Sequence, residues 1–253
     1  MRKKIIIGNW KMSPDNLRGA QNLFQKCKTV SQKTRNVQTI ICAPFIYLSE
    51  LKKLSTGRAA LGAQDVSSKK DDAYTGEISS AQLKSMNINY VIVGHSERRA
   101  MGENNEMVAK KVVATTTNGL IAILCVGETT RDDSGSYIPF VKTQLLESLA
   151  LLTHKNASFL MVAYEPLWSV GKNTKHIAKP EDALEMSIFI KKVLTDKFGK
   201  KIAEKIPVLY GGSVDQKNAR DFLVEGGVAG LLVGRASLQA EIFTEIQKIA
   251  NKI

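Results

Sequence analysis

Glu165 has the setting of a catalytic carboxylate. It comes shortly after an apolar run, residues 158–163, whose length and β-branched content are typical of a buried strand. Pro166 then restricts the backbone, and Trp168 lies in a loop that runs on to Gly171. Such a loop could bury its apolar residues over a ligand and exclude water from the carboxylate beneath it. A solvated Glu beside a surface loop is the simpler alternative.

Two pairs of polar residues stand at the ends of other apolar runs. Asn9 and Lys11 are two positions apart, so in an extended chain their side chains point the same way and offer an amide and a cation. Otherwise, Lys11 is a surface residue beyond a strand. His95 and Glu97 have the same spacing after residues 90–94. Backbone dipoles at a helix start would keep His95 neutral, and a structural His bonded to the backbone is the alternative.

The elements that must position these residues recur along the chain. The apolar runs are residues 4–10, 37–43, 59–64, 90–94, 120–126, 158–164, 206–210 and 229–234. Amphipathic stretches predict helices at residues 102–117, 138–152, 180–198, 216–225 and 239–253, the fourth with Asp215 as its N-cap. Eight strands alternating with helices predict an α/β protein, a closed (β/α)8 barrel with one domain over residues 1–253. A doubly wound sheet is the alternative, but no G-x-G-x-x-G motif follows the first run.

Glycine-rich turns follow the last two predicted strands, at residues 210–214 and 232–237. In (β/α)8 barrels the active site lies at the C-terminal ends of the strands, and the loops after strands seven and eight commonly bind phosphate through backbone N–H groups. Gly211, Gly212 and Gly234 allow that close approach, although tight connections also need Gly. Together with the Lys, the His and the Glu, these turns suit proton abstraction beside a carbonyl in a small phosphorylated substrate.

Composition narrows the classes of function. Hydrophobic residues make up 43% of the chain and charged residues 24%, which is ordinary for a globular protein. The net charge of +12 would suit anionic partners, but the lysines are spread along helices and no aromatic–basic interleaving supports nucleic-acid binding. No stretch approaches ~18 apolar residues, so no membrane span is expected. Cys27, Cys42 and Cys125 have no metal-ligand spacing, which predicts reduced thiols, a cytoplasmic location and no metal site.

Six segments, in this order along the chain, resemble the signature segments of the triosephosphate isomerase family. They are residues 8–11 (Gly-Asn-Trp-Lys), 73–78 (Ala-Tyr-Thr-Gly-Glu-Ile), 93–99 (Val-Gly-His-Ser-Glu-Arg-Arg), 125–128 (Cys-Val-Gly-Glu), 163–168 (Ala-Tyr-Glu-Pro-Leu-Trp) and 210–214 (Tyr-Gly-Gly-Ser-Val). The resemblance implies an aldose–ketose isomerase of glycolysis and gluconeogenesis. It would interconvert dihydroxyacetone phosphate and D-glyceraldehyde 3-phosphate through an enediol(ate), with no cofactor.

The resemblance also implies a role for each site residue. Glu165 would be the base, His95 the electrophile that moves protons between substrate oxygens, and Lys11 the cation that meets the substrate and its phosphate. Glu97 would orient Lys11, and Ser96 would hold Glu165 before the substrate binds. The other expected substrate-binding residues are Asn9, Gly171, Ser213, Gly234 and Arg235.

The resemblance also implies a partner subunit, and the sequence differs from the family pattern at several positions. The family is typically homodimeric through the loop around Thr75, whereas the sequence alone would favour a mobile surface loop there. Arg235 stands where the family usually has a second Gly; it is harmless at negative φ and costs about 1 kcal/mol or more at positive φ. Residues 172–176 differ from the usual lid, the loop at 129–136 is shorter, and Asp72 replaces a usual Gly.

Two rival functions stay open from the residues alone. A different phosphate-binding barrel enzyme, such as a sugar-phosphate epimerase, would need a metal cluster or a second carboxylate at the strand ends, and neither is evident in the sequence. A non-catalytic nucleic-acid-binding role would rest on the net charge of +12 and would show a steep salt dependence.

Overall fold

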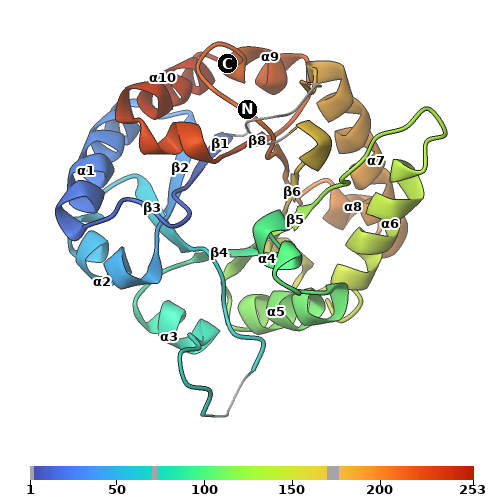
Figure 1. Ribbon diagram of the computed structural model, residues 1–253, viewed down its shortest axis with the longest axis horizontal. Coiled ribbons are helices and arrows are strands. Elements are labelled where there is room, and N and C mark those ends of the chain that lie inside the picture. The colour runs from blue at the N-terminus through green and yellow to red at the C-terminus, as the bar shows by residue number, and fades with distance from the viewer. Residues whose placement is uncertain (1–2, 70–72, 170–176) are drawn as a thin grey trace.

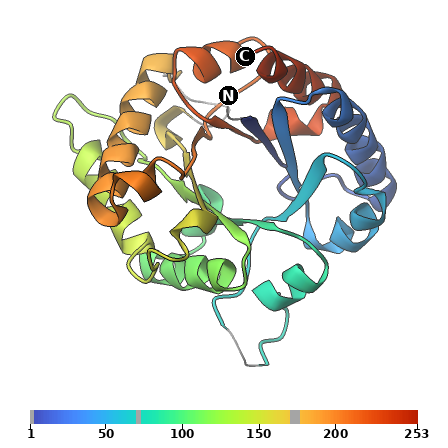
Figure 2. The same cartoon turned by 180° about the vertical axis from the view of Figure 1, so that it is seen from behind.

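The strands of the chain close into a parallel barrel. The computed structural model describes residues 3–69, 73–169 and 177–253. Within these residues, eight strands pair in chain order, and β8 returns to pair with β1. The helices form a ring around the barrel, which Figures 1 and 2 show from its two sides. The predicted (β/α)8 architecture is therefore confirmed.

Each strand lies inside the apolar run that predicted it. The strands are β1 (Lys4–Asn9), β2 (Val37–Cys42), β3 (Ala59–Ala63), β4 (Tyr90–Val93), β5 (Ile121–Val126), β6 (Leu160–Tyr164), β7 (Val208–Tyr210) and β8 (Gly230–Val233). Strands that are buried on both faces read as continuous apolar runs, and this makes them recognisable in the sequence.

The helices lie between the strands. They are α1 (Leu17–Lys33), α2 (Phe45–Leu54), α3 (Ser80–Ser85), α4 (Ser96–Ala100), α5 (Asn105–Thr117), α6 (Tyr137–Ser148), α7 (Pro180–Phe198), α8 (Lys200–Ala203), α9 (Ala219–Val224) and α10 (Ala240–Asn251), with short 3-10 turns η1 (Ala157–Phe159), η2 (Leu167–Ser169) and η3 (Arg235–Leu238). In the part of the chain that the structure describes, none of these helices has the length and apolar character needed to cross a membrane.

One predicted helix start is wrong. Helix α9 begins at Ala219, and its N-cap is Asn218 rather than Asp215. The Asp215 carboxylate accepts the backbone N–H groups of Lys217 at 2.7 Å and Asn218 at 3.4 Å. It therefore caps a turn that precedes the helix, because a short acidic side chain bonds N–H groups in either setting.

The phase of side chains along each strand directs the site residues inward. In β1, Ile7 packs in the barrel interior, whereas Ile6 belongs to the core between strands and helices. Full burial of an Ile contributes about 1.5–3 kcal/mol, so a slip that reversed this phase would be costly. Asn9 continues the inward phase of Ile7, and Glu165 continues that of Ala163 in β6. Both polar side chains therefore reach the same mouth of the barrel.

Candidate active site

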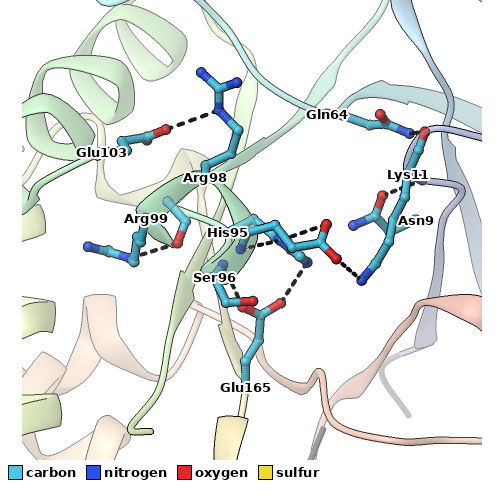
Figure 3. Close-up of polar contacts among 11 residues, drawn as sticks. Asn9, Lys11, Gln64, His95, Ser96, Arg98, Arg99, Glu103 and Glu165 are labelled. Carbon is cyan, nitrogen blue, oxygen red and sulfur yellow. Dashed lines mark hydrogen bonds and ion pairs between the residues drawn. The ribbon is translucent and has the colours of Figure 1, made fainter. Parts of the chain in front are cut away.

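The Glu165 carboxylate is buried at the mouth of the barrel, where its side chain crosses toward the end of β4. The residue is only 4% exposed. Its Oε2 accepts the backbone N–H of Ser96 at 3.1 Å, and its Oε1 lies 3.1 Å from Nε2 of His95 (Figure 3). Its own backbone N–H donates to the Val126 carbonyl at 2.8 Å. A carboxylate that α4 holds in this way, on a backbone that is bonded to β5, is shielded from bulk water and faces an imidazole.

A turn at Gly94 positions His95, and the backbone conformation of this turn is easily adopted only by glycine. Gly94 has φ +66°, in the left-handed region, and this turn makes His95 the N-cap of α4. The His95 Nδ1 accepts the backbone N–H of Glu97 at 3.2 Å. A nitrogen that accepts a hydrogen bond carries no proton, so the ring is the neutral tautomer with its proton on Nε2, facing Glu165.

Lys11 holds a strained backbone conformation that turns its side chain across the mouth. Its φ is +52°, which costs a non-glycine residue about 1–2 kcal/mol. Two hydrogen bonds support it: the Lys11 N–H donates to Asn9 Oδ1 at 3.0 Å, and the Lys11 carbonyl accepts from Gln64 Nε2 at 2.9 Å. The Lys11 Nζ then lies 2.5 Å from Oε1 of Glu97, whose backbone N–H donates to the His95 ring.

Two further residues of the site were missed in the sequence. Gln64 follows β3 directly and also donates to the Cys42 carbonyl at 2.9 Å, so it ties the ends of β1 and β2 together. Its signal, a polar residue at the end of an apolar run, is the one that identified Glu165. Cys125 is fully buried, and its burial, followed by the neighbouring Glu165, raises the pKa of its thiol. It stays neutral beside the carboxylate.

The glycine turns after β7 and β8 reach the same groups. A Cβ on Gly211 would lie 3.0 Å from Cγ of Glu165, and a Cβ on Gly234 would lie 3.6 Å from Cε of Lys11. Gly211 also donates its N–H to the Tyr164 carbonyl at 2.7 Å. The turns therefore place bare backbone beside both the carboxylate and the cation, where an anionic ligand could approach.

The remaining predicted residues lie around this cluster. Ser213 donates its hydroxyl to the Ser169 carbonyl at 3.1 Å, which joins the turn after β7 to η2. Arg235 opens η3 with an exposed side chain and is not among the described non-glycine residues with positive φ, so its side chain introduces no backbone strain. Gly171, residues 172–176 and Asp72 lie outside the described residues.

The arrangement suits transfer of a proton to and from carbon. A shielded carboxylate can act as a general base, a neutral imidazole N–H can stabilise an oxygen that gains negative charge, and a lysine can neutralise an anionic substrate. Among the described residues, no three His, Cys, Asp or Glu side chains gather in a way that would hold a metal ion.

Comparison with known proteins agrees with this chemistry. The family model for triosephosphate isomerase matches residues 4–250. Three relatives bear the name triosephosphate isomerase. The protein of Cytophaga hutchinsonii is 39% identical in a match that covers 98% of this chain and 99% of the relative. The protein of Carboxydothermus hydrogenoformans is 41% identical, covering 98% of this chain and 99% of the relative. The protein of Fusobacterium nucleatum is 40% identical, covering 99% of this chain and 100% of the relative. The chain belongs to the triosephosphate isomerase family.

Proposed function

We propose that this chain interconverts dihydroxyacetone phosphate and D-glyceraldehyde 3-phosphate, as its family membership implies, in glycolysis and gluconeogenesis. One observation carries the proposal beyond the family name. Glu165 is 4% exposed, and its carboxylate accepts a hydrogen bond from the backbone N–H of Ser96. The carboxylate also lies 3.1 Å from the protonated nitrogen of a neutral His95. A base and an electrophile that face each other across a shielded mouth are the two groups that this isomerisation needs.

In the proposed reaction, Glu165 removes a proton from the hydroxymethyl carbon of dihydroxyacetone phosphate. The electron pair of the broken C–H bond forms the C1–C2 double bond, and the carbonyl pair moves to O2, which gives an enediolate. The Nε2–H of His95 protonates O2 and His95 takes the proton from O1. Glu165 then returns its proton to C2, and the aldehyde forms at C1. Atoms and charge balance without a cofactor.

The remaining roles concern charge and position. We assign Lys11 to neutralise the substrate phosphate and the developing enediolate, with Glu97 orienting its ammonium group. Asn9 would donate to a substrate oxygen, and Ser96 would hold Glu165 between turnovers through its N–H. The proposed phosphate contacts are the backbone N–H groups of Gly171, Ser213, Gly234 and Arg235.

The decisive experiment is an isomerase assay with D-glyceraldehyde 3-phosphate, coupled to NADH-dependent reduction of dihydroxyacetone phosphate. We expect turnover without added metal, and a carbon-bound deuterium in the product when the reaction runs in heavy water, because the proton that Glu165 takes from carbon can exchange with solvent before Glu165 returns it. Consumption of the substrate without dihydroxyacetone phosphate, or product without deuterium at any conversion, would argue for a different enzyme.

Replacing Arg235 with Gly is expected to change the KM for glyceraldehyde 3-phosphate by less than about fivefold, since exposed ionic contacts contribute about 0–1 kcal/mol. The proposed contact of Arg235 is its backbone N–H, which Gly retains, and kcat should not change. The KM is compared at fixed ionic strength because long-range attraction is screened by salt. A much larger rise in KM would mean that the guanidinium itself binds the phosphate.

We further propose a cytoplasmic homodimer that associates through the loop around Thr75. Three side chains near the C-terminal strand ends, Met12, Ile46 and Met101, are 95%, 78% and 70% exposed. They follow β1, β2 and β4, and the described part of the connection between β3 and α3, which contains Thr75, projects beyond the helix ring (Figure 1). A projecting loop among exposed apolar side chains is suited to a partner surface.

Sedimentation velocity is expected to give twice the monomer mass for this chain. Met12→Asp and Thr75→Arg should each weaken the dimer at least about 100-fold, because a buried charge without a partner costs about 3 kcal/mol or more. The control is Ile188→Asp on α7, which adds the same charge as Met12→Asp at another exposed apolar site, 62% exposed. A chain that stays monomeric at all concentrations, or equal effects of the three variants, would contradict this interface.

A further inference from the structure

A cavity of about 290 Å³ lies beside Glu165, on the side of β5 and α6. Its walls come from the ends of β4, β5 and β6 and from α4 and α6. Glu165 and Ser96 line it, whereas Lys11 and His95 do not. In the view of Figure 3, Arg99, which also lines the cavity, and Lys11 lie on opposite sides of the Glu165 carboxylate. The cavity therefore adjoins the proposed base without being the substrate site.

The cavity extends from the protein surface to the carboxylate. Ala100 on α4 and Phe140 on α6 are exposed at its rim, Phe140 by 49%. Cys125 and Val126 of β5 are buried, and with Glu165 they form the inner end. A small molecule could enter here from solvent and reach Glu165 without passing through the barrel mouth.

The size and the apolar walls of the cavity suit a small organic molecule. An engineered apolar cavity of about 150 Å³ holds benzene, and natural ligand pockets begin at about 300 Å³. At about 290 Å³, this cavity has room for a substituted aromatic ring. The side chains of Phe140, Val126 and Leu167 give it apolar walls.

Gln144 of α6 brings a hydrogen-bond donor to the cavity. The residue lines the cavity and is only 8% exposed. Its Oε1 accepts the backbone N–H of Gly127 at 2.8 Å, which identifies the other end of the amide, Nε2, as the donor. Among the described residues, this Nε2 has no acceptor. Because a buried donor without an acceptor is costly, a ligand that offers a carbonyl oxygen to Gln144 would gain from the contact.

The charges around the cavity favour an uncharged ligand. The Arg99 guanidinium is engaged by the protein, since it donates to the Gly94 carbonyl at 2.7 Å and to Asn105 Oδ1 at 2.6 Å. Two longer hydrogen bonds, to a backbone carbonyl and a serine hydroxyl, engage its remaining nitrogen. An anion would meet the Glu165 carboxylate at the inner end, and burying it there would be costly. This argues against a second site for a phosphorylated substrate.

We propose that the cavity binds a small uncharged molecule with an aromatic ring and one carbonyl oxygen, the ring against Phe140 and Leu167 and the oxygen on Nε2 of Gln144. Such a ligand would contact Glu165 while its carboxylate accepts the N–H of Ser96. Binding shifts the population toward the conformer that the ligand contacts better, so the ligand should hold the base in this position. The ligand should then lower kcat without competing with the substrate, and this effect rests on the proposed isomerase function.

The test ligand is acetophenone, added to the whole protein without substrate. Heteronuclear NMR should show saturable shifts of the Gly127 and Ser96 N–H signals, with a Kd on the order of 1 mM, ordinary for a ligand of this size. Saturating inorganic phosphate should change this Kd by less than about twofold, because the proposed phosphate turns lie outside the cavity. Ethylbenzene, which lacks the carbonyl, and benzoate, which adds a charge, should each bind at least about fivefold more weakly.

A substitution at the rim tests the location. Ala100→Phe should fill the entrance and weaken acetophenone binding at least about tenfold. The control is Ala150→Phe, the same substitution at another exposed alanine that does not line the cavity, and it should bind like the parent. Thr129→Phe, also at the exposed rim, replaces Ala100→Phe if the latter does not fold.

Several binding results would overturn the proposal. Shifts that grow linearly with acetophenone up to its solubility limit would mean that no site exists. Equal affinity in the parent and in the rim variants would place the ligand elsewhere. Equal affinity for ethylbenzene and acetophenone would contradict the contact with Gln144.

The isomerase assay tests the effect on Glu165 separately. Saturating acetophenone should lower kcat at least about threefold and leave KM nearly unchanged. A rise in KM alone, or an unchanged kcat at saturation, would contradict the coupling to Glu165. Acetophenone binding by a chain without isomerase activity would contradict the proposed function alone, whereas an active isomerase that does not bind acetophenone would contradict this site alone.

Discussion

Glu165→Asp is expected to fold normally and to lose about 10²–10³-fold in kcat, within the range that a general base contributes. The shorter side chain withdraws the carboxylate by about one C–C bond, and a misplacement of about 1 Å at the reacting atoms costs about 10²-fold. Substrate binding should change much less, because the proposed phosphate contacts come from the turns after β7 and β8 and from Lys11. We therefore expect the substitution to lower kcat and to change KM much less.

The control for this prediction is the same substitution at an exposed carboxylate. Glu106→Asp on α5, whose side chain is 72% exposed, should keep both parameters. Glu165→Gln, which retains the length and cannot accept the proton, should lose at least as much as Glu165→Asp. Full turnover of Glu165→Asp would remove this residue from the role of base. Circular dichroism and the melting temperature show whether each variant keeps its fold.

The part of the site that could be predicted from the sequence follows from the period of a strand. Glu165 and Asn9 continue the inward phase of buried strands, so a polar residue there must face the barrel mouth. Gln64 follows β3 in the same way, and the same rule would have identified it. All eight strands of the described residues were recognisable because burial on both faces leaves an uninterrupted apolar run.

The rest depends on contacts between side chains distant in the sequence. The left-handed conformation of Lys11 is supported by Gln64, 53 positions away, and no local pattern in the sequence indicates it. The hydrogen bond between the indole of Trp168 and Glu128 joins residues 40 positions apart. Asp215 shows the opposite difficulty, since the same local hydrogen bonds suit a helix cap or a preceding turn.

Lys11→Met should lower kcat/KM by at least about 10²–10³-fold, the loss typical when a group that stabilises developing charge is removed. We expect kcat to fall and KM to rise, because the same ammonium group is proposed to neutralise the phosphate and the enediolate. Stability should hardly change. The Lys11–Glu97 pair is partly exposed, with side-chain exposures of 37% and 59%, and such pairs contribute about 0–1 kcal/mol. The backbone bonds from Asn9 and Gln64 do not depend on the side chain.

Lys26→Met is the matched control for this loss of charge. Lys26 also forms an exposed ion pair, with Glu241 at 3.1 Å, and removing it lowers the net charge equally. If general attraction of an anionic substrate to a chain of net charge +12 explained the effect, the two variants would lose similar activity, and added salt would abolish the difference from the parent. A loss confined to Lys11→Met, persisting at high salt, assigns the effect to a cation whose side chain lies beside Gly234, in the proposed phosphate turn after β8.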